Sequence, residues 1–294
     1  TDKRLYQQFM QGFLEKQPLI TIRQGEVVAL DRYKDLWRLT LSTGITFEVP
    51  AVVIATGTFL RGRVHIGPLS FPSGPQGQHP ANALAEHLEA QGLIFKRFKT
   101  GTPARVRKRS VNFAAMVEQP GDYLDHGFSY WLPWRPHEPV SCWLTYTNEK
   151  THAIIRNNLH LAPMYCGAIK GIGTRYCPAI ENKVVNFPQR DRHQVFIEPE
   201  GLNTDEMYIA GLSSSLPEEI QDQFIRTVPG LEEVEIVRPG YAIEYDVIAP
   251  EQLQNSMQIR GWPGVFSAGQ INGTSGYEEA AAQGIMAGIN AGLY

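Results

Sequence analysis

The sequence predicts an α/β fold with an inserted α+β domain, and three observations support this prediction. Residues 51–55 form an apolar run without alternation, which is typical of a strand covered on both faces in a parallel sheet. Residues 265–268 form a second short strand, followed by a glycine-rich turn and a helix over 277–291. Residues 102–169 are rich in proline and aromatic side chains and fit neither pattern, which indicates an insertion. We therefore expect domains at 1–103, 104–205 and 206–294.

The first elements form a helix and a small β-meander. A helix is expected over residues 1–16, where Leu5, Phe9 and Phe13 line one side and serve ordinary packing. The β-rich runs that follow are separated by turn residues and end in the sharp turn at Thr56 and Gly57. Strands are expected at 19–22, 26–31, 36–41, 45–49 and 51–55.

Helices and strands mix in the rest of the chain. Leu84 and Leu88 share one face of a predicted helix over 80–91, which ends at Gly92. Further strands are expected at 93–98, 140–147, 194–197, 206–209, 234–237 and 265–268, and further helices after Asn148 and over 217–227.

Composition limits the possible functions. With 294 residues, of which 43% are hydrophobic, the chain can bury a large core. It contains no apolar stretch of about 18 residues, so we expect a soluble cytoplasmic protein without a membrane helix. Cys142, Cys166 and Cys177 fit neither a disulfide framework nor a metal site, and no metal is expected. Because the net charge is -3, contact with nucleic acid requires a local cluster of basic residues.

The closing segment carries the strongest chemical signal. A glycine-rich turn at the start of a helix presents free backbone N–H groups and the positive end of the helix dipole to an electron-rich ligand. The pyrimidine carbonyl of a flavin, which gathers negative charge on reduction, is such a ligand. Ala280, Gly284 and Gly288 lie four residues apart and leave one helix face open to close packing. An ordinary βα unit packed by small residues explains the same spacing equally well.

Thr56 and Gly57 end the buried strand at 51–55 and form the second signal. In flavoproteins with two dinucleotide-binding domains, a strand of this kind returns to the FAD domain, and its tight turn passes near the cofactor. Apolar strands also end in Thr-Gly for turn reasons alone. The Thr56-Gly57 turn becomes a more specific sign of a flavoprotein because the glycine-rich closing segment follows it later in the chain.

Cys177 lies in a loop bounded by glycine and proline, with Arg175 and Lys183 nearby in the sequence. Neighbouring positive charges lower a thiol pKa, so Cys177 is a candidate nucleophile. The alternative is that it is a small buried side chain, as most cysteines outside disulfides are. Cys142 lies in an apolar strand and is interpreted as core, whereas the sequence leaves Cys166 undecided.

A basic run without an acidic residue covers positions 96–109, and Phe95 and Phe98 are interleaved with it. This pattern predicts contacts with RNA phosphates, although a strand edge protected by lysines gives the same pattern. The candidate RNA-binding residues are Arg61, Arg63, Lys96, Arg97, Lys99, Arg105, Arg107, Lys108 and Arg109.

Seven strings together resemble the MnmG (GidA) family over nearly the whole chain. They occupy residues 58–67, 99–103, 145–152, 175–178, 198–201, 238–246 and 268–284. The resemblance implies the two-dinucleotide-binding flavoprotein fold, with a glutathione-reductase-like FAD domain that is incomplete here and an inserted α+β domain. The family's G-x-G-x-x-G fingerprint is missing, so we expect that the chain begins after the first βαβ unit and also lacks the helical C-terminal domain.

The resemblance also implies site residues. Val27 would lie beside the adenosine part of FAD and Gln270 at the flavin, residues 173–187 would bind the nicotinamide nucleotide, and Cys177 would be catalytic. The full set of cofactor-binding candidates is Val27, Thr56, Gly57, Gly173, Arg175, Tyr176, Pro178, Gly269, Gln270, Asn272, Gly273 and Gly276.

The implied reaction is the FAD- and NADH-dependent addition of a carboxymethylaminomethyl or aminomethyl group at C5 of the wobble uridine of tRNA. A folate would donate the one-carbon unit, the GTPase MnmE would be the partner, and a homodimer is expected. A thiolate that adds at C6 would turn the uracil ring into an enolate able to attack an electrophilic carbon. Two alternatives remain: a folate- and FAD-dependent tRNA uridine-5-methyltransferase like TrmFO, and a non-catalytic module that binds RNA or a partner.

Overall fold

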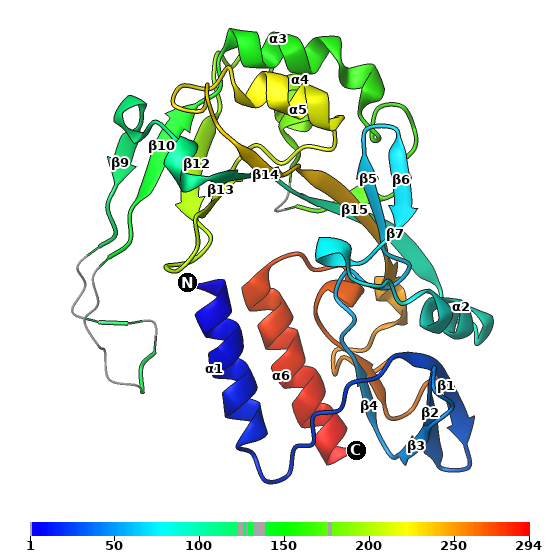
Figure 1. Cartoon of the computed structure of the whole chain (residues 1–294). Coiled ribbons are helices and arrows are strands. Elements are labelled where there is room, and N and C mark those ends of the chain that lie inside the picture. Colours follow the sequence, from blue (N-terminus) through cyan, green and yellow to red (C-terminus); the bar gives the residue numbers. More distant parts are fainter. Residues whose placement is uncertain (1, 123–125, 128, 132–138, 176–177) are drawn as a thin grey trace. The chain divides into compact units, whose positions relative to one another are not determined.

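The computed structural model describes residues 1–294 except 1, 123–125, 128, 132–138 and 176–177 (Figure 1). The chain forms two compact units. The first consists of Thr1–Lys16, Pro103–Leu159 and Ala179–Gly240, and the second of Gln17–Thr102, His160–Pro178 and Tyr241–Tyr294.

The second unit begins with the predicted meander. Strands β1 (Val27–Tyr33), β2 (Leu36–Leu41) and β3 (Thr46–Val49) pair antiparallel, as expected, but no strand forms over residues 19–22. Helix α2 (Asn82–Ala90) packs against β1, where Leu30, Leu84 and Leu88 share one buried cluster. The apolar face of α2 and the apolar face of the meander therefore pack against each other, which explains both sequence patterns.

A two-stranded parallel sheet joins the beginning and the end of this unit. Strand β4 (Val52–Ile54) pairs with β16 (Val265–Ser267), and helix α6 (Tyr277–Leu293) follows (Figure 1). The Ala268 N–H donates to the Ile54 carbonyl oxygen at 3.0 Å. The two segments expected to be neighbours are therefore adjacent. Val53 is 39% exposed, so the described residues do not cover both faces of β4.

The largest sheet of the second unit contains a long strand that the sequence analysis missed. The order is β11 (Ile172–Gly173), β7 (Phe95–Thr102), β15 (Tyr241–Ile248), β5 (Arg63–Ile66) and β6 (Leu69–Pro72). All residues of β15 after Tyr241 are buried, although Glu244 and Asp246 are charged.

The first unit is built on a six-stranded sheet. Its order is β14 (Ile236–Arg238), β8 (Arg105–Arg107), β13 (Glu206–Ala210), β12 (Gln194–Pro199), β10 (Cys142–Tyr146) and β9 (Val117–Gln119). Its α-helices are α1 (Lys3–Glu15), α3 (Glu149–Asn157), α4 (Ile180–Asn186) and α5 (Glu218–Ile225). Short 3-10 turns complete the chain at Pro75–Gly77, Lys108–Ser110, Phe113–Ala115, Leu159–Leu161, Pro250–Gln252 and Gly269–Asn272.

The limits of the two units differ from the predicted limits at 103 and 205. Strand β8 pairs with both β13 and β14, which draws residues 206–240 into the same unit as the predicted insertion. The N-terminal helix also belongs to this unit, because the Asp2 carboxylate accepts the Leu202 N–H and Lys3 pairs with Glu200. Residues 160–178 join the other unit, because β11 pairs with β7.

Two glycines with the same backbone conformation allow a matched test of the β4–β16 junction. Gly44 has φ 84° and Gly264 has φ 85°. A Cβ at Gly44 would meet nothing within 4 Å, whereas one at Gly264 would lie 2.7 Å from the Pro50 carbonyl oxygen, just before β4.

We expect Gly44→Ala to lower the free energy of unfolding by about 1 kcal/mol through the left-handed conformation alone. Gly264→Ala should cost about 1–3 kcal/mol more, because the backbone of Pro50 must move. Chemical denaturation of the two variants measures the difference. Equal losses would contradict the tight junction between β4 and β16.

Candidate cofactor-binding site

A cavity of about 570 Å³ lies where the start of β1 approaches the end of β4. Val27, Thr56 and Gly57, three predicted cofactor-binding residues, line it together. Apolar side chains make up most of the wall, and Glu26 is the charged residue among those lining it. A concave, mostly apolar space with a few polar groups is typical of small-molecule sites. The full lining is Gly25, Glu26, Val27, Leu30, Leu39, Val52, Val53, Ile54, Ala55, Thr56, Gly57, Phe59, Ala81 and Leu84.

Thr56 supplies a polar group with unused hydrogen-bonding capacity in this wall. Its Oγ1 atom is buried and has no hydrogen-bond partner among the described residues. A buried hydroxyl without a partner costs free energy, so a ligand that reaches this atom gains a hydrogen bond at a site already desolvated. The cavity therefore fits a ligand with an apolar ring system and polar edges, as the adenosine and flavin parts of FAD have.

The closing turn lies next to this region but does not line the cavity. It leaves β16 just as Thr56 and Gly57 leave the neighbouring parallel strand β4, so both turns emerge at the same edge. The five candidate residues of this turn are Gly269, Gln270, Asn272, Gly273 and Gly276.

Hydrogen bonds within the chain hold the closing turn in place. Asn272 Nδ2 donates to the Ser267 carbonyl and to Gln283 Oε1, each at 3.0 Å, and its Oδ1 accepts from Ser267 Oγ at 2.6 Å. The Gly269 N–H also donates to Gln283 Oε1. Asn272 is buried and its amide is used inside the turn, so it shapes the turn. Gln270 Nε2 donates to the buried Tyr245 hydroxyl at 3.0 Å.

The start of α6 is not open in the way the sequence predicts. The Glu279 carboxylate accepts from Thr274 Oγ1 at 2.8 Å and fills the space in which a Cβ on Gly276 would stand. A carboxylate is favourable at the positive end of a helix dipole, so the chain supplies its own anion here. A Cβ at Gly284 or Gly288 meets no described atom within 4 Å, so nothing described packs on that helix face.

The segment predicted to bind nicotinamide is described only in part. Gly173 lies in β11, and Arg175 and Pro178 are exposed. Tyr176 and Cys177 lie outside the described residues. Cys166 is exposed, whereas Cys142 is half-buried in β10, where burial raises the pKa of its thiol.

The residues of the predicted RNA-binding run mostly pair with carboxylates from distant parts of the sequence. Lys96 contacts Glu251 at 2.8 Å, and Lys99 is only 2% exposed, which removes it from any RNA-contacting surface. The absence of acidic neighbours in the chain therefore does not imply their absence in space. The other pairs are Arg61 with Glu89 and Asp246, Arg97 with Glu244 and Asp246, Arg105 with Glu200, and Arg107 and Arg109 with Glu235. Arg63, which donates to Ser70, and Lys108 remain exposed.

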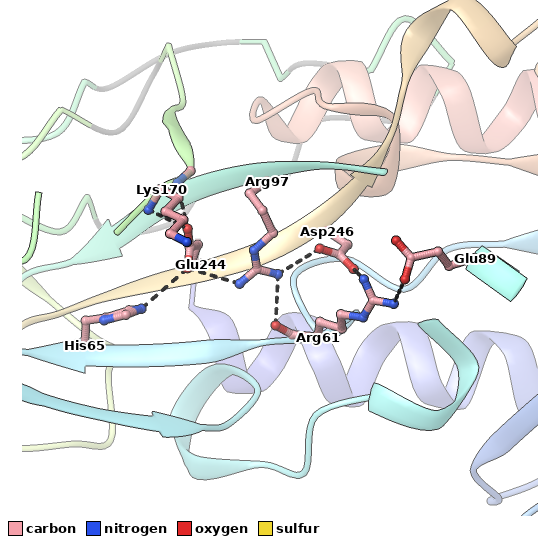
Figure 2. Close-up of polar contacts among 8 residues, drawn as sticks. Arg61, His65, Glu89, Arg97, Lys170, Glu244 and Asp246 are labelled. Carbon is pink, nitrogen blue, oxygen red and sulfur yellow. Dashed lines mark hydrogen bonds and ion pairs between the residues drawn. The ribbon is translucent and has the colours of Figure 1, made fainter. Parts of the chain in front are cut away.

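A buried network of charges, which the sequence analysis missed, lies in the five-stranded sheet (Figure 2). Arg97 Nη1 donates to Asp246 Oδ1 at 2.8 Å, and its Nη2 donates to Glu244 Oε2 at 3.2 Å. Arg61 contacts the second Asp246 oxygen at 3.2 Å, and His65 Nε2 lies 3.7 Å from Glu244. Two carboxylates at alternate positions within the string 238–246 are the sequence signal that could have revealed this network.

The two carboxylates respond differently to burial. Burial alone would raise the pKa of Glu244, but the His65 ring, the Arg97 guanidinium and the Lys170 backbone N–H hold it at about 2. Burial raises the pKa of Asp246 above its usual value, against the opposing effect of Arg97 and Arg61. Glu244 is therefore ionised at neutral pH, and its charge depends on the groups that surround it.

We expect Arg97→Met to lower the free energy of unfolding by about 3 kcal/mol, because it leaves two buried carboxylates with one fewer cationic partner. Lys96→Met is the matched control on the same strand; its pair with Glu251 is exposed and should contribute at most about 1 kcal/mol. Denaturation at several pH values measures both losses.

The pH dependence follows from the sign of the Glu244 shift. Its pKa is lowered from 4.5 to about 2 in the folded chain, so its contribution is complete above pH 4.5 and declines as the pH falls toward 2. The cost of Arg97→Met should also decline as the pH falls toward 2, and the decline should begin at a higher pH, because the pKa of Asp246, the other carboxylate that Arg97 contacts, is raised. A cost that does not change with pH would contradict the assignment to this ion pair.

Comparison with known proteins gives consistent matches. The family model of glucose inhibited division protein A matches residues 1–294. The chain is 54% identical over 294 residues to the tRNA uridine 5-carboxymethylaminomethyl modification enzyme MnmG of Caldicellulosiruptor saccharolyticus, covering 100% of this chain and 47% of that protein. It is 50% identical over 293 residues to MnmG of Clostridium botulinum, covering 99% and 47%. The chain thus spans about half the length of the curated relatives it matches.

A solved structure gives the same answer for the fold. The structure of Aquifex aeolicus GidA in its form II crystal aligns with a TM-score of 0.91 at 44% identity, covering 100% of this chain and 48% of that one. These matches confirm the resemblance found in the sequence and the predicted fold class. Among the described residues, no helix is long and apolar enough to cross a membrane. No cluster of three or more potential metal-binding side chains occurs in that part of the chain either.

Proposed function

This chain belongs to the glucose inhibited division protein A (GidA) family, and on this premise we propose that it forms the cofactor-binding core of an enzyme that modifies a uridine in tRNA. The substrate is the wobble uridine, and the product carries a carboxymethylaminomethyl or aminomethyl group at C5. The chain spans about half the length of its curated relatives, so the proposed activity is that of the full-length protein.

The cavity beside β4 is the observation that carries the proposal. It brings together Val27, which the family resemblance assigns to FAD, and Thr56 and Gly57, which the turn after a buried strand predicts to lie near the cofactor. Val27 and the apolar wall would hold the adenosine part, and the Thr56 hydroxyl would donate to or accept from a polar edge of the cofactor. Bound FAD would supply a hydride or carry the one-carbon unit, and NADH would reduce it.

The remaining roles belong to other segments. Residues 173–178 would bind the nicotinamide nucleotide, and Cys177 would add to C6 of the uracil ring and so make C5 nucleophilic. Exposed Arg63 and Lys108, for which no ion pair is described, are the RNA-binding candidates most suited to RNA phosphates. A folate would donate the one-carbon unit, MnmE would be the GTPase partner, and the protein would act as a cytoplasmic homodimer.

Two exposed alanines allow a direct test of the FAD assignment. Ala55 lines the cavity, whereas Ala83 lies on α2 outside it. We expect Ala55→Trp in the full-length protein to fill the cavity and lower the FAD content of the purified protein at least tenfold, by the steric cost of overpacking. Ala83→Trp should keep the flavin absorbance. If Ala55→Trp keeps its full FAD content, FAD does not bind in this cavity.

Replacement of Cys177 tests the chemical step. We expect Cys177→Ser to abolish modification of the wobble uridine while FAD stays bound, because a hydroxyl is a far weaker nucleophile than a thiolate at neutral pH. Cys166→Ser, at an exposed cysteine, is the control. Mass spectrometry of tRNA nucleosides from complemented deletion strains gives the readout.

The same nucleoside analysis separates the alternatives. Loss of ribothymidine with an intact wobble uridine in the deletion strain would identify a methyltransferase like TrmFO instead. A purified full-length protein that is colourless and gains no flavin absorbance with added FAD would support a non-catalytic binding module.

A further inference from the structure

We propose that Glu244 is a positioning residue, which clamps residues 170–174 onto the edge of β7 and thereby orients Gly173 and the adjoining Arg175. The role in orienting a nicotinamide site rests on the proposed function. The clamp itself rests on contacts within the second unit.

One carboxylate oxygen of Glu244 holds the backbone of this segment. Glu244 Oε1 accepts the Lys170 N–H at 2.9 Å and the Gly171 N–H at 2.6 Å (Figure 2). Charge-assisted hydrogen bonds of this kind are about twice as strong as neutral ones. Glu244 is only 5% exposed and lies in the middle of the sheet, so the anchor point is rigid.

The other oxygen keeps the anchor ionised and in place. Oε2 contacts Arg97 at 3.2 Å and His65 at 3.7 Å, from the strands on either side of β15. The hydrogen bond from Arg97 thus holds Oε2 in place, the His65 ring lies nearby, and Oε1 faces the segment. Both oxygens of Glu244 face N–H donors: Oε1 faces the backbone of Lys170 and Gly171, and Oε2 faces Arg97. In Glu244→Gln, one oxygen becomes an N–H₂ group, which would meet one of these donors instead of accepting from it.

After Gly171, the segment pairs with β7, and at Gly171 itself there is no space for a larger side chain. Ile172 and Gly173 pair in parallel with Phe98 and Lys99, and the Thr174 N–H donates to the Lys99 carbonyl at 3.0 Å. A Cβ at Gly171 would lie 2.9 Å from the Phe98 carbonyl carbon and 3.1 Å from Glu244 Cγ. Strand β11 has only two residues and lies at the sheet edge, so it depends on contacts such as those of Glu244.

Asp246 provides the matched control. It lies two residues away on the same strand, is 1% exposed and contacts the same Arg97. Among the described residues its ion pairs are with Arg97 and Arg61, not with residues 170–174. A general effect of removing a buried charge should therefore occur in Asp246→Asn as well as in Glu244→Gln. An effect through the clamp should occur only in Glu244→Gln.

The experiment measures amide hydrogen exchange in the full-length, FAD-loaded protein. We expect Glu244→Gln to speed exchange at residues 170–174 by about tenfold or more, as loss of hydrogen bonds to a charged group implies. Asp246→Asn should leave this segment near the wild-type rate. Wild-type exchange in Glu244→Gln, or the same acceleration in both variants, overturns the proposal.

A kinetic readout separates positioning from stability. Bleaching of the flavin absorbance by NADH should show a KM for NADH raised about tenfold in Glu244→Gln, with the FAD content and the limiting rate near wild type. A lower limiting rate with an unchanged KM contradicts the nicotinamide part of the proposal. If NADH does not bleach the wild-type flavin, the proposed function fails while the exchange result still decides the clamp.

Gly171→Ala keeps the test decisive if Glu244→Gln does not fold. This change leaves the charges intact but forces residues 170–171 away from Phe98 and from Glu244. It should speed exchange at 170–174 to a similar extent and raise the same KM. Unchanged exchange in this variant overturns the proposal as well.

Discussion

The pairing of β7 with β15 is the interaction on which the rest of the second unit depends. In this antiparallel register Glu244 lies opposite Lys99 and Asp246 lies opposite Arg97. A slip by one residue would move every side chain to the other face, and a slip by two would place these carboxylates opposite Arg97 and Phe95. Buried charges add little stability because their desolvation is costly, but they can specify an arrangement. The neighbouring strands β5 and β11 then take their positions from β15 and β7.

The second constraint is the parallel pairing of β4 with β16. These strands are separated by some two hundred residues in the chain, yet they place the Thr56 turn and the closing turn at the same edge. Helix α2 and the meander also contribute to the cavity, because Leu84, Val27 and Leu30 are among its lining residues. The cavity is therefore a product of non-local contacts that bring together two ends of the unit, and its wall depends on the tight junction at Gly264.

Local sequence patterns predicted the helices and strands whose own residues determine their structure. Alternation in β2 and the amphipathic face of α2 gave these elements within two residues of their observed limits. The pattern failed for β15, because Glu244 and Asp246 interrupt its apolar run and their partners come from other strands. The ion pairs of the basic run were not visible in the sequence for the same reason, since charge pairing over long sequence separations leaves no local trace. In the cavity, Val27 came only from family resemblance, whereas the Thr56 turn also had a physical signal of its own.

Hydrogen-bonding capacity distinguishes residues that shape the candidate site from residues that can bind a ligand. Glycine-rich turns make both kinds look alike in a sequence, because the same polar residues flank the glycines. The amide of Asn272 is already used within the closing turn, and the Glu279 carboxylate already occupies the start of α6. By contrast, Thr56 Oγ1 is buried beside the cavity and has no partner among the described residues. An unsatisfied buried hydroxyl is costly, so this atom calls for a partner such as a water molecule or a polar atom of a ligand. Among these described polar groups, Thr56 Oγ1 therefore keeps free hydrogen-bonding capacity, whereas the Asn272 amide and the Glu279 carboxylate are already used within the chain.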